Sequence, residues 1–113
     1  MDKIIISDTS CLIALTNVEK LEILRDLYHE IFITKEVYEE FGGTQPDWIM
    51  VCEVKDLHKI SELENRLDKG EASSIALALE IPNCTLIIDE VKGRKIATSL
   101  NLDYWNNRNI VTR

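Results

Sequence analysis

The chain is predicted to form an α/β domain of three layers, with helices flanking a central, mostly parallel sheet. Two short runs of branched aliphatic residues, Ile4 to Ile6 and Leu86 to Ile88, are typical of strands buried on both faces. Segments with helical periodicity lie between them, and this alternation predicts parallel strands joined by helices. The length of 113 residues suits one hydrophobic core, so we expect a single domain over residues 1–113.

Capping residues and glycines mark the expected elements of the first half. Ser, Thr, Asp and Asn accept hydrogen bonds from the first N–H groups of a helix, whereas glycine commonly ends one. These signals predict, in order, a strand over Ile4–Asp8, a helix from a cap at Thr9 or Ser10 to Leu15, a helix from Thr16 to Tyr28, a strand over Glu30–Ile33, a helix over Lys35–Phe41 and a loop over Thr44–Trp48.

The second half continues the alternation of strands and helices. Asp68-Lys69-Gly70 is expected to break one helix before the next begins, and Pro82 to end the second. The expected elements are an extended piece over Met50–Val54, helices over Leu57–Leu67 and Glu71–Leu79, a strand over Thr85–Ile88, a helix over Lys92–Leu100, a strand start at Asp103–Trp105 and a loop or tail over Asn106–Asn109.

Charge and cysteine usage restrict the class of protein. A net charge of −7 argues against general affinity for nucleic acid, although a bound divalent cation would invert the local field at a phosphate site. Cys11, Cys52 and Cys84 are odd in number and lack the spacing of zinc ligands. Without an evident signal peptide or membrane span, we expect reduced cysteines in a cytoplasmic protein.

Two aspartates directly follow the two buried strands. Asp8 ends the first run, and Asp89 ends the second with Glu90 as its neighbour or substitute. In open α/β sheets, ligands bind just beyond the carboxyl ends of the strands. Carboxylates that converge there repel one another unless a cation joins them. The pattern therefore predicts an acidic metal site.

Helix geometry adds two glutamates. Glu40 flanks the buried stripe that Val37 marks, and Glu71 shares the face of Ile75, where an idle charge is costly. Each carboxylate also has a simpler explanation: an Asp caps a helix, Glu71 complements the helix dipole, and Glu40 is solvated. The prediction rests on the agreement of all these positions.

Four segments, in order, resemble motifs of PIN-domain proteins. The segments are Asp8–Leu15 (Asp-Thr-Ser-x-Leu-Ile-Ala-Leu), Val37–Phe41, Gly70–Ala78 (Gly-Glu-Ala-x-x-Ile-Ala-Leu-Ala) and Leu86–Arg94. The resemblance covers roughly Ile4 to Leu102 and implies a compact PIN-like α/β nuclease fold, often the toxin of a toxin–antitoxin pair.

The resemblance also implies a site and a reaction. It implies metal ligation by Asp8, Asp89, Glu90 and Glu71, the last either as a ligand or as a group that orients water. It also implies a catalytic set of Asp8, Glu40, Glu71 and Asp89 that cuts RNA with Mg²⁺ or Mn²⁺. Thr9 or Ser10 would orient Asp8 through a hydroxyl group. Ligands that are all oxygen suit such hard cations, which acidify a bound water and stabilise charge on a phosphate. The implied partners are an RNA substrate and an antitoxin protein.

Lys92, Arg94 and Lys95 open the last predicted helix. Near a helix N-terminus they are placed to meet substrate phosphates, but they equally suit a solvated face. A homodimer is common for small cytosolic domains and is expected as one arrangement here.

The C-terminal segment departs from the family pattern. Family members usually continue after Leu102 with a further strand, a Gly-Thr turn and a closing helix, so residues 103–113 are expected to be a divergent or truncated tail without them. Two other functions stay open. One is a degenerate PIN domain that binds protein or RNA without cutting. The other is a phosphoryl-transfer domain with Asp8 as nucleophile, although Ser10 stands where a dehalogenase-type phosphatase needs a second Asp.

Overall fold

The computed structural model contains a five-stranded parallel sheet with the strand order β3-β2-β1-β4-β5. It describes residues 4–17, 31–42 and 49–105. The elements are β1 (Ile4–Ser7), α1 (Thr9–Asn17), β2 (Ile31–Thr34), α3 (Lys35–Phe41), β3 (Ile49–Cys52), α4 (Leu57–Leu63), α5 (Lys69–Glu80), β4 (Cys84–Ile87), α6 (Val91–Ser99) and β5 (Asp103–Trp105).

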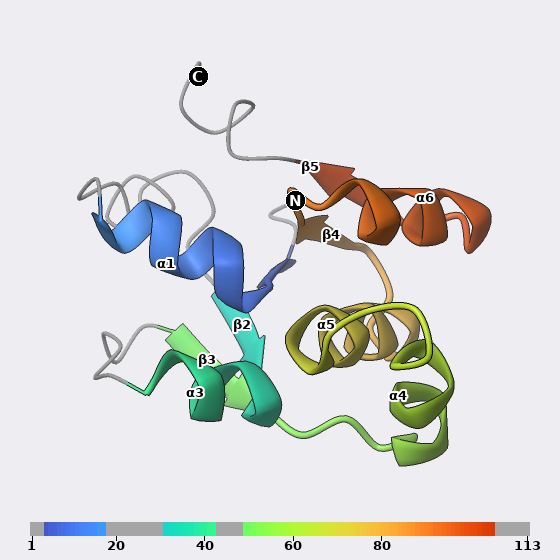
Figure 1. Cartoon of the computed structure of the whole chain (residues 1–113), viewed down its shortest axis with the longest axis horizontal. Coiled ribbons are helices and arrows are strands. Elements are labelled where there is room, and N and C mark those ends of the chain that lie inside the picture. The colour runs from blue at the N-terminus through green and yellow to red at the C-terminus, as the bar shows by residue number, and fades with distance from the viewer. Residues whose placement is uncertain (1–3, 18–30, 43–48, 106–113) are drawn as a thin grey trace.

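Helices cover both faces of this sheet, which confirms the α/β prediction. Side chains alternate between faces along a strand, so Ile5 and Ile6 of β1 enter different cores. Ile5 packs with residues of α1 and α3, whereas Ile6 packs with residues of α4, α5 and α6. Figure 1 shows the same division, with α1 and α3 together on the left and α4, α5 and α6 on the right.

The strand order reverses beside β1. The chain passes from β1 to β2 and β3 on one side, and then returns to place β4 and β5 on the other. The first residues beyond β1 and β4 therefore lie at the switch point, where sheets of this kind bind ligands. Asp8, which follows β1, and Asp89, which follows β4, are close to that point.

Most predicted elements are present, with shifted ends. Asp8 caps α1, so the predicted cap at Thr9 or Ser10 is wrong, and the helix runs on to Asn17. The predicted helix over Thr16–Tyr28 begins inside α1 and otherwise lies outside the described residues, as does the predicted loop over Thr44–Trp48.

Two more predicted ends need correction. Helix α4 ends at Leu63 rather than Leu67, and α5 already begins at Lys69, inside the predicted break. Helix α3 ends as predicted, at Gly42, which adopts the left-handed conformation (φ 64°) that glycine allows without strain.

The expectation that the usual C-terminal strand is missing is wrong. Asp103–Trp105 forms β5, which pairs in parallel with β4 and places Tyr104 beside Leu86. This edge strand is held by its pairing with β4 on one side and by its contact with α6. Residues 106–113, where a closing helix would follow, lie outside the described residues.

None of the helices in the described parts of the chain is long and apolar enough to cross a bilayer.

Candidate active site

Asp8 uses its two carboxylate oxygens differently. Oδ1 accepts a hydrogen bond of 2.9 Å from the N–H of Cys11 and so caps α1. Asp8 is only 1% exposed, so Oδ2 is shielded from water, yet Oδ2 has no hydrogen-bond partner in the described residues. The helix-cap role and a ligand role are therefore compatible, because each requires one oxygen.

Burial raises the pKa of Asp8 to about 6, because an ionised carboxylate loses its hydration. Hydrogen bonds from the Cys11 N–H and thiol lower the pKa in part, and the charges of Asp68 and Asp89 raise it. The net increase means that negative charge at this position is under-compensated by the protein itself. A nearby cation would restore the ionised form.

Glu71 lies in the first turn of α5 and is also buried, with 6% of its surface exposed. Its Oε2 is the second buried carboxylate oxygen of the site without a hydrogen-bond partner in the described residues. Burial, followed by the charges of Asp68, Asp8 and Glu90, raises the pKa of Glu71 to about 8. The prediction that Glu71 faces inward is confirmed.

Asp68 belongs to this acidic group, although the sequence pattern suggested only a helix break there. Its Oδ1 caps α5 by accepting a 2.8 Å hydrogen bond from the N–H of Glu71. Its charge raises the pKa of both Asp8 and Glu71. A signal was present, because Asp68 and Glu71 have the three-residue spacing of a capping box.

Glu40, at the end of α3, lies against α1 and α5. The Thr9 hydroxyl donates a 3.1 Å hydrogen bond to Glu40 Oε1, so Thr9 orients Glu40 and not Asp8. A Cβ on Gly70 would lie 2.6 Å from Thr9 Oγ1 and closer still to Glu40 Oε1. The predicted role of Ser10 is also wrong in the described residues, where this exposed side chain has no hydrogen bond to Asp8.

Asp89 and Glu90 are exposed and lead into α6. Asp89 raises the pKa of Asp8, and Glu90, the N-cap residue of α6, raises that of Glu71. A Cβ on Gly93 would lie 2.9 Å from Glu71 Oε2, so the first turn of α6 closely approaches Glu71. Strand ends and helix starts thus bring Asp8, Glu71, Asp89 and Glu90 to one end of the sheet, where Glu40 joins them from the end of α3 through its contact with Thr9.

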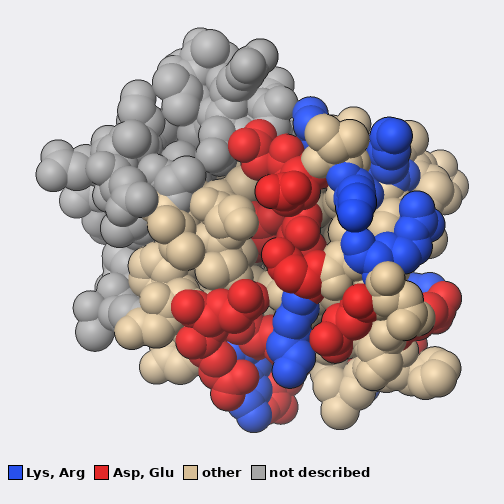
Figure 2. Space-filling model, viewed as in Figure 1, with Lys and Arg blue, Asp and Glu red and all other residues tan. Residues whose placement is uncertain are grey.

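Acidic side chains form a stripe down the centre of one face (Figure 2). Within the described parts of the chain, no three His, Cys, Asp or Glu side chains are grouped closely enough to form a ready metal site. Instead, two carboxylates, Asp8 and Glu71, are buried, and each has one oxygen without a hydrogen-bond partner in the described residues. Burial and neighbouring carboxylates raise the pKa of both.

The predicted basic residues separate in the structure. Lysine and arginine side chains gather to the right of the acidic stripe in Figure 2. Arg94 and Lys95 line a cavity between α6 and β5, together with Tyr104, whereas Lys92 is exposed on α6 and is not among the residues that line it. Tyr104 was not predicted as a site residue, because only the pairing of β5 with β4 brings it next to α6.

Comparison with protein-family models supports the resemblance to PIN-domain proteins. No curated protein matches the chain. The sequence model of the PIN domain family matches residues 4–110, which extends beyond Leu102 through β5. The chain therefore belongs to the PIN domain family.

Proposed function

We propose that this protein is a ribonuclease that uses Mg²⁺ or Mn²⁺ and the carboxylates of Asp8, Glu40, Glu71 and Asp89. PIN domains are generally nucleases, which supports the reaction class. The observation that carries the metal dependence is the pair of buried carboxylate oxygens, Asp8 Oδ2 and Glu71 Oε2, without hydrogen-bond partners in the described residues.

The donor set fits a hard divalent cation. A buried acceptor without a donor costs free energy, and neighbouring carboxylates increase that cost. A cation offsets both, and the oxygen ligands present are of the kind that Mg²⁺ and Mn²⁺ prefer. Asp8 and Glu71 would hold it, with Asp89 and Glu90 next to them. When bound, the metal acidifies a water molecule and stabilises charge on the phosphate that is cut.

The protein residues around this pair keep the carboxylates in place. The Cys11 N–H and thiol hold Asp8, and Asp68 holds the first turn of α5 and thereby Glu71. Glu40, kept at the exposed rim by Thr9, is placed to accept a hydrogen bond from a water molecule that approaches the substrate.

We further propose that the protein acts as the toxin of a cytoplasmic toxin–antitoxin pair, with RNA as substrate and a protein antitoxin as partner. The support is the order and spacing of the family motifs from Asp8 to Arg94. The alternative of a degenerate, non-cutting domain was favoured by the atypical C-terminal segment. Of that segment, β5 supplies a strand, which weakens the alternative, and residues 106–113 lie outside the described residues.

Cleavage of RNA by matched variants tests the reaction. Wild type, Asp8→Asn and Glu71→Gln, purified by one route, are incubated with total RNA and Mn²⁺, and the products are separated on gels. We expect both variants to lose at least about a hundredfold in rate, because each removes a charge that holds the metal. Glu64→Gln, an exposed carboxylate at the end of α4, should retain the wild-type rate. Equal cleavage by wild type and Asp8→Asn would identify a contaminating enzyme and contradict the proposal.

A further inference from the structure

A cavity of about 310 Å³, open to solvent, lies between α6 and β5. Tyr104 lines it from β5, and four residues line it from one face of α6: Val91, Arg94, Lys95 and Thr98. Their spacing of three, four and seven places these four on a single helical stripe. The volume is at the lower end of the ~300–1,000 Å³ typical of small-molecule sites. A ligand the size of one nucleotide suits it.

The cations of this cavity have no carboxylate partner in the part of the chain that the structure describes. Arg94 Nε is buried and has no hydrogen-bond acceptor in the described residues. Across residues 4–17, 31–42 and 49–105, no ion pair joins Arg94 or Lys95 to a carboxylate. Arg94 and Lys95 line the cavity, and a phosphate oxygen is a strong acceptor for hydrogen bonds from a guanidinium or an ammonium group. The cavity therefore favours an anionic ligand, in a protein whose net charge is −7.

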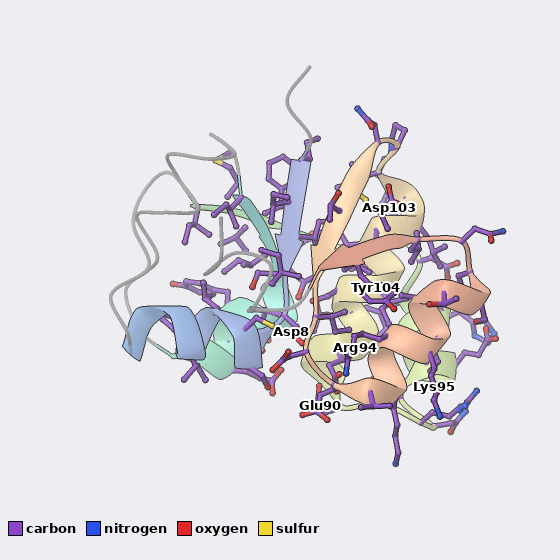
Figure 3. All side chains as sticks on the ribbon, turned by 90° about the horizontal axis from the view of Figure 1, so that it is seen from above. Asp8, Glu90, Arg94, Lys95, Asp103 and Tyr104 are labelled. Carbon is purple, nitrogen blue, oxygen red and sulfur yellow. The ribbon has the colours of Figure 1, made fainter. Side chains whose placement is uncertain are left out.

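The remaining walls suit a flat, partly apolar group. Tyr104 presents a half-buried aromatic ring, and Val91 is unusually exposed for a valine, at 56%. Aromatic side chains next to cations are the common means by which proteins hold single-stranded nucleic acid, since every base has a face on which a ring can stack. Figure 3 shows Arg94, Lys95 and Tyr104 on these two elements, with Glu90 at the start of α6.

Helix α6 connects the cavity to the acidic carboxylates, because its first turn approaches Glu71 and one of its faces lines the cavity. Gly93 of α6 approaches Glu71 Oε2, and the next residue along the chain is Arg94. The backbone N–H of Arg94 bonds to the carbonyl of Glu90, whose carboxylate acts on Glu71. Helix α6 thus joins the acidic carboxylates, at its first turn, to the helix face that lines the cavity.

We infer that this cavity binds one nucleotide of single-stranded RNA next to the phosphate that is cut. Arg94 and Lys95 contact the phosphate of that nucleotide, and its base packs on Tyr104 and Val91. The inference rests on the proposed function for its choice of ligand, but it concerns binding and not cleavage.

Binding of RNA without cleavage tests this inference. Each variant is made in an Asp8→Asn background and measured by fluorescence anisotropy with a labelled, mixed-sequence RNA decamer in EDTA. Arg94→Gln should weaken binding at least about fivefold and reduce the slope of log Kd against log salt by about 0.7, the value for one phosphate contact on a single strand. Tyr104→Ala should weaken binding about 5- to 100-fold, and Tyr104→Phe should restore it, because the ring is kept.

Matched controls separate the cavity from general charge and folding effects. Lys55→Gln removes one exposed positive charge elsewhere, and Tyr38→Ala removes an exposed ring on α3. Both should bind like the parent, and circular dichroism checks that each variant folds. If Arg94→Gln and Tyr104→Ala also bind like the parent, or if the parent does not bind RNA, the inference is overturned. Cleavage and metal binding by the Asp8-containing protein would then still support the proposed function. Conversely, loss of metal binding with intact, cavity-dependent RNA binding would contradict only the proposed function.

Discussion

Asp8 shows how one residue serves the fold and the site together. Its Oδ1 replaces a missing helical hydrogen bond at the start of α1, while Oδ2 stays buried and unsatisfied. An aspartate is a good helix cap, but an asparagine is equally good, so capping alone does not require a negative charge. The charge adds a cost in the metal-free protein, which is consistent with a role in binding a cation.

The stability of the metal-free protein should decrease as the pH rises. Burial raises the pKa of Asp8 from 3.8 to about 6 and that of Glu71 from 4.5 to about 8. Between about pH 4 and pH 8, the folded state binds more protons than the unfolded state. The free energy of unfolding therefore falls as the pH rises and levels off above the folded pKa of Glu71. Thermal unfolding in EDTA should therefore give a higher Tm at pH 5.5 than at pH 8.

The double variant Asp8→Asn, Glu71→Gln provides the control for this pH effect. It removes both raised carboxyl groups and should flatten the dependence of Tm on pH, with a higher Tm than wild type at pH 8. A wild-type Tm that rises between pH 5.5 and pH 8 would contradict the burial and charge crowding derived for these groups.

Two glycines on neighbouring helices should respond differently to the same added methyl group. In α5, a Cβ on Gly70 would meet Thr9 Oγ1 and the end of the exposed Glu40 side chain, which can move aside. Gly70→Ala should therefore change the free energy of unfolding by less than about 1 kcal/mol, because the better helix propensity of alanine partly offsets the cost of displacing these side chains. It should slow RNA cleavage at least about tenfold, because it displaces Glu40.

Thr9→Val is the companion to Gly70→Ala, since it breaks the hydrogen bond to the same carboxylate. Unfolding curves and cleavage rates of both variants should agree in showing a folded but slower enzyme. Wild-type rates in both variants would exclude a part for Glu40 in the reaction.

In α6, Gly93→Ala should destabilise the protein. A Cβ there would lie 2.5 Å from Cδ1 of Ile88, which is fully buried and cannot yield without moving α6. Overpacking of this kind costs about 1–3 kcal/mol, so Tm should fall by several degrees, as measured by thermal unfolding. The same Cβ crowds Glu71 Oε2, so Mn²⁺ affinity should also fall. An unchanged Tm would show that α6 does not pack as closely as described.

At the scale of the whole molecule, the elements followed from local patterns more readily than their arrangement. The buried aliphatic runs and the caps indicated most of the strands and helices correctly in kind. Strand order depends on packing between distant segments, so no local pattern indicated that β5 would pair with β4. The C-terminal segment looked atypical because its sequence differs from the family pattern, yet Asp103–Trp105 forms the edge strand of the sheet.

The candidate site shows the same limit. Asp8, Asp89 and Glu71 could be selected because strand ends and helix faces are visible in a sequence. The hydrogen-bond partner of Thr9 could not be predicted, because Glu40 is 31 residues away and comes close only through the packing of α1 against α3. Asp68 was not selected as a site residue because the segment around it resembles a helix break. Tyr104 was not selected because only the pairing of β5 with β4 brings it close to α6.

The most direct test of this account is calorimetric titration of Mn²⁺ into the wild type, Asp8→Asn and the exposed control Glu64→Gln at pH 7. We predict binding by the wild type and the control, with release of protons because the pKa of Glu71 is about 8 in the metal-free state. Titration in two buffers of different ionisation enthalpy measures that release. Binding should be lost in Asp8→Asn while its fold is kept. A folded wild type that binds no Mn²⁺, or an Asp8→Asn variant that binds it equally well, would contradict the acidic metal site.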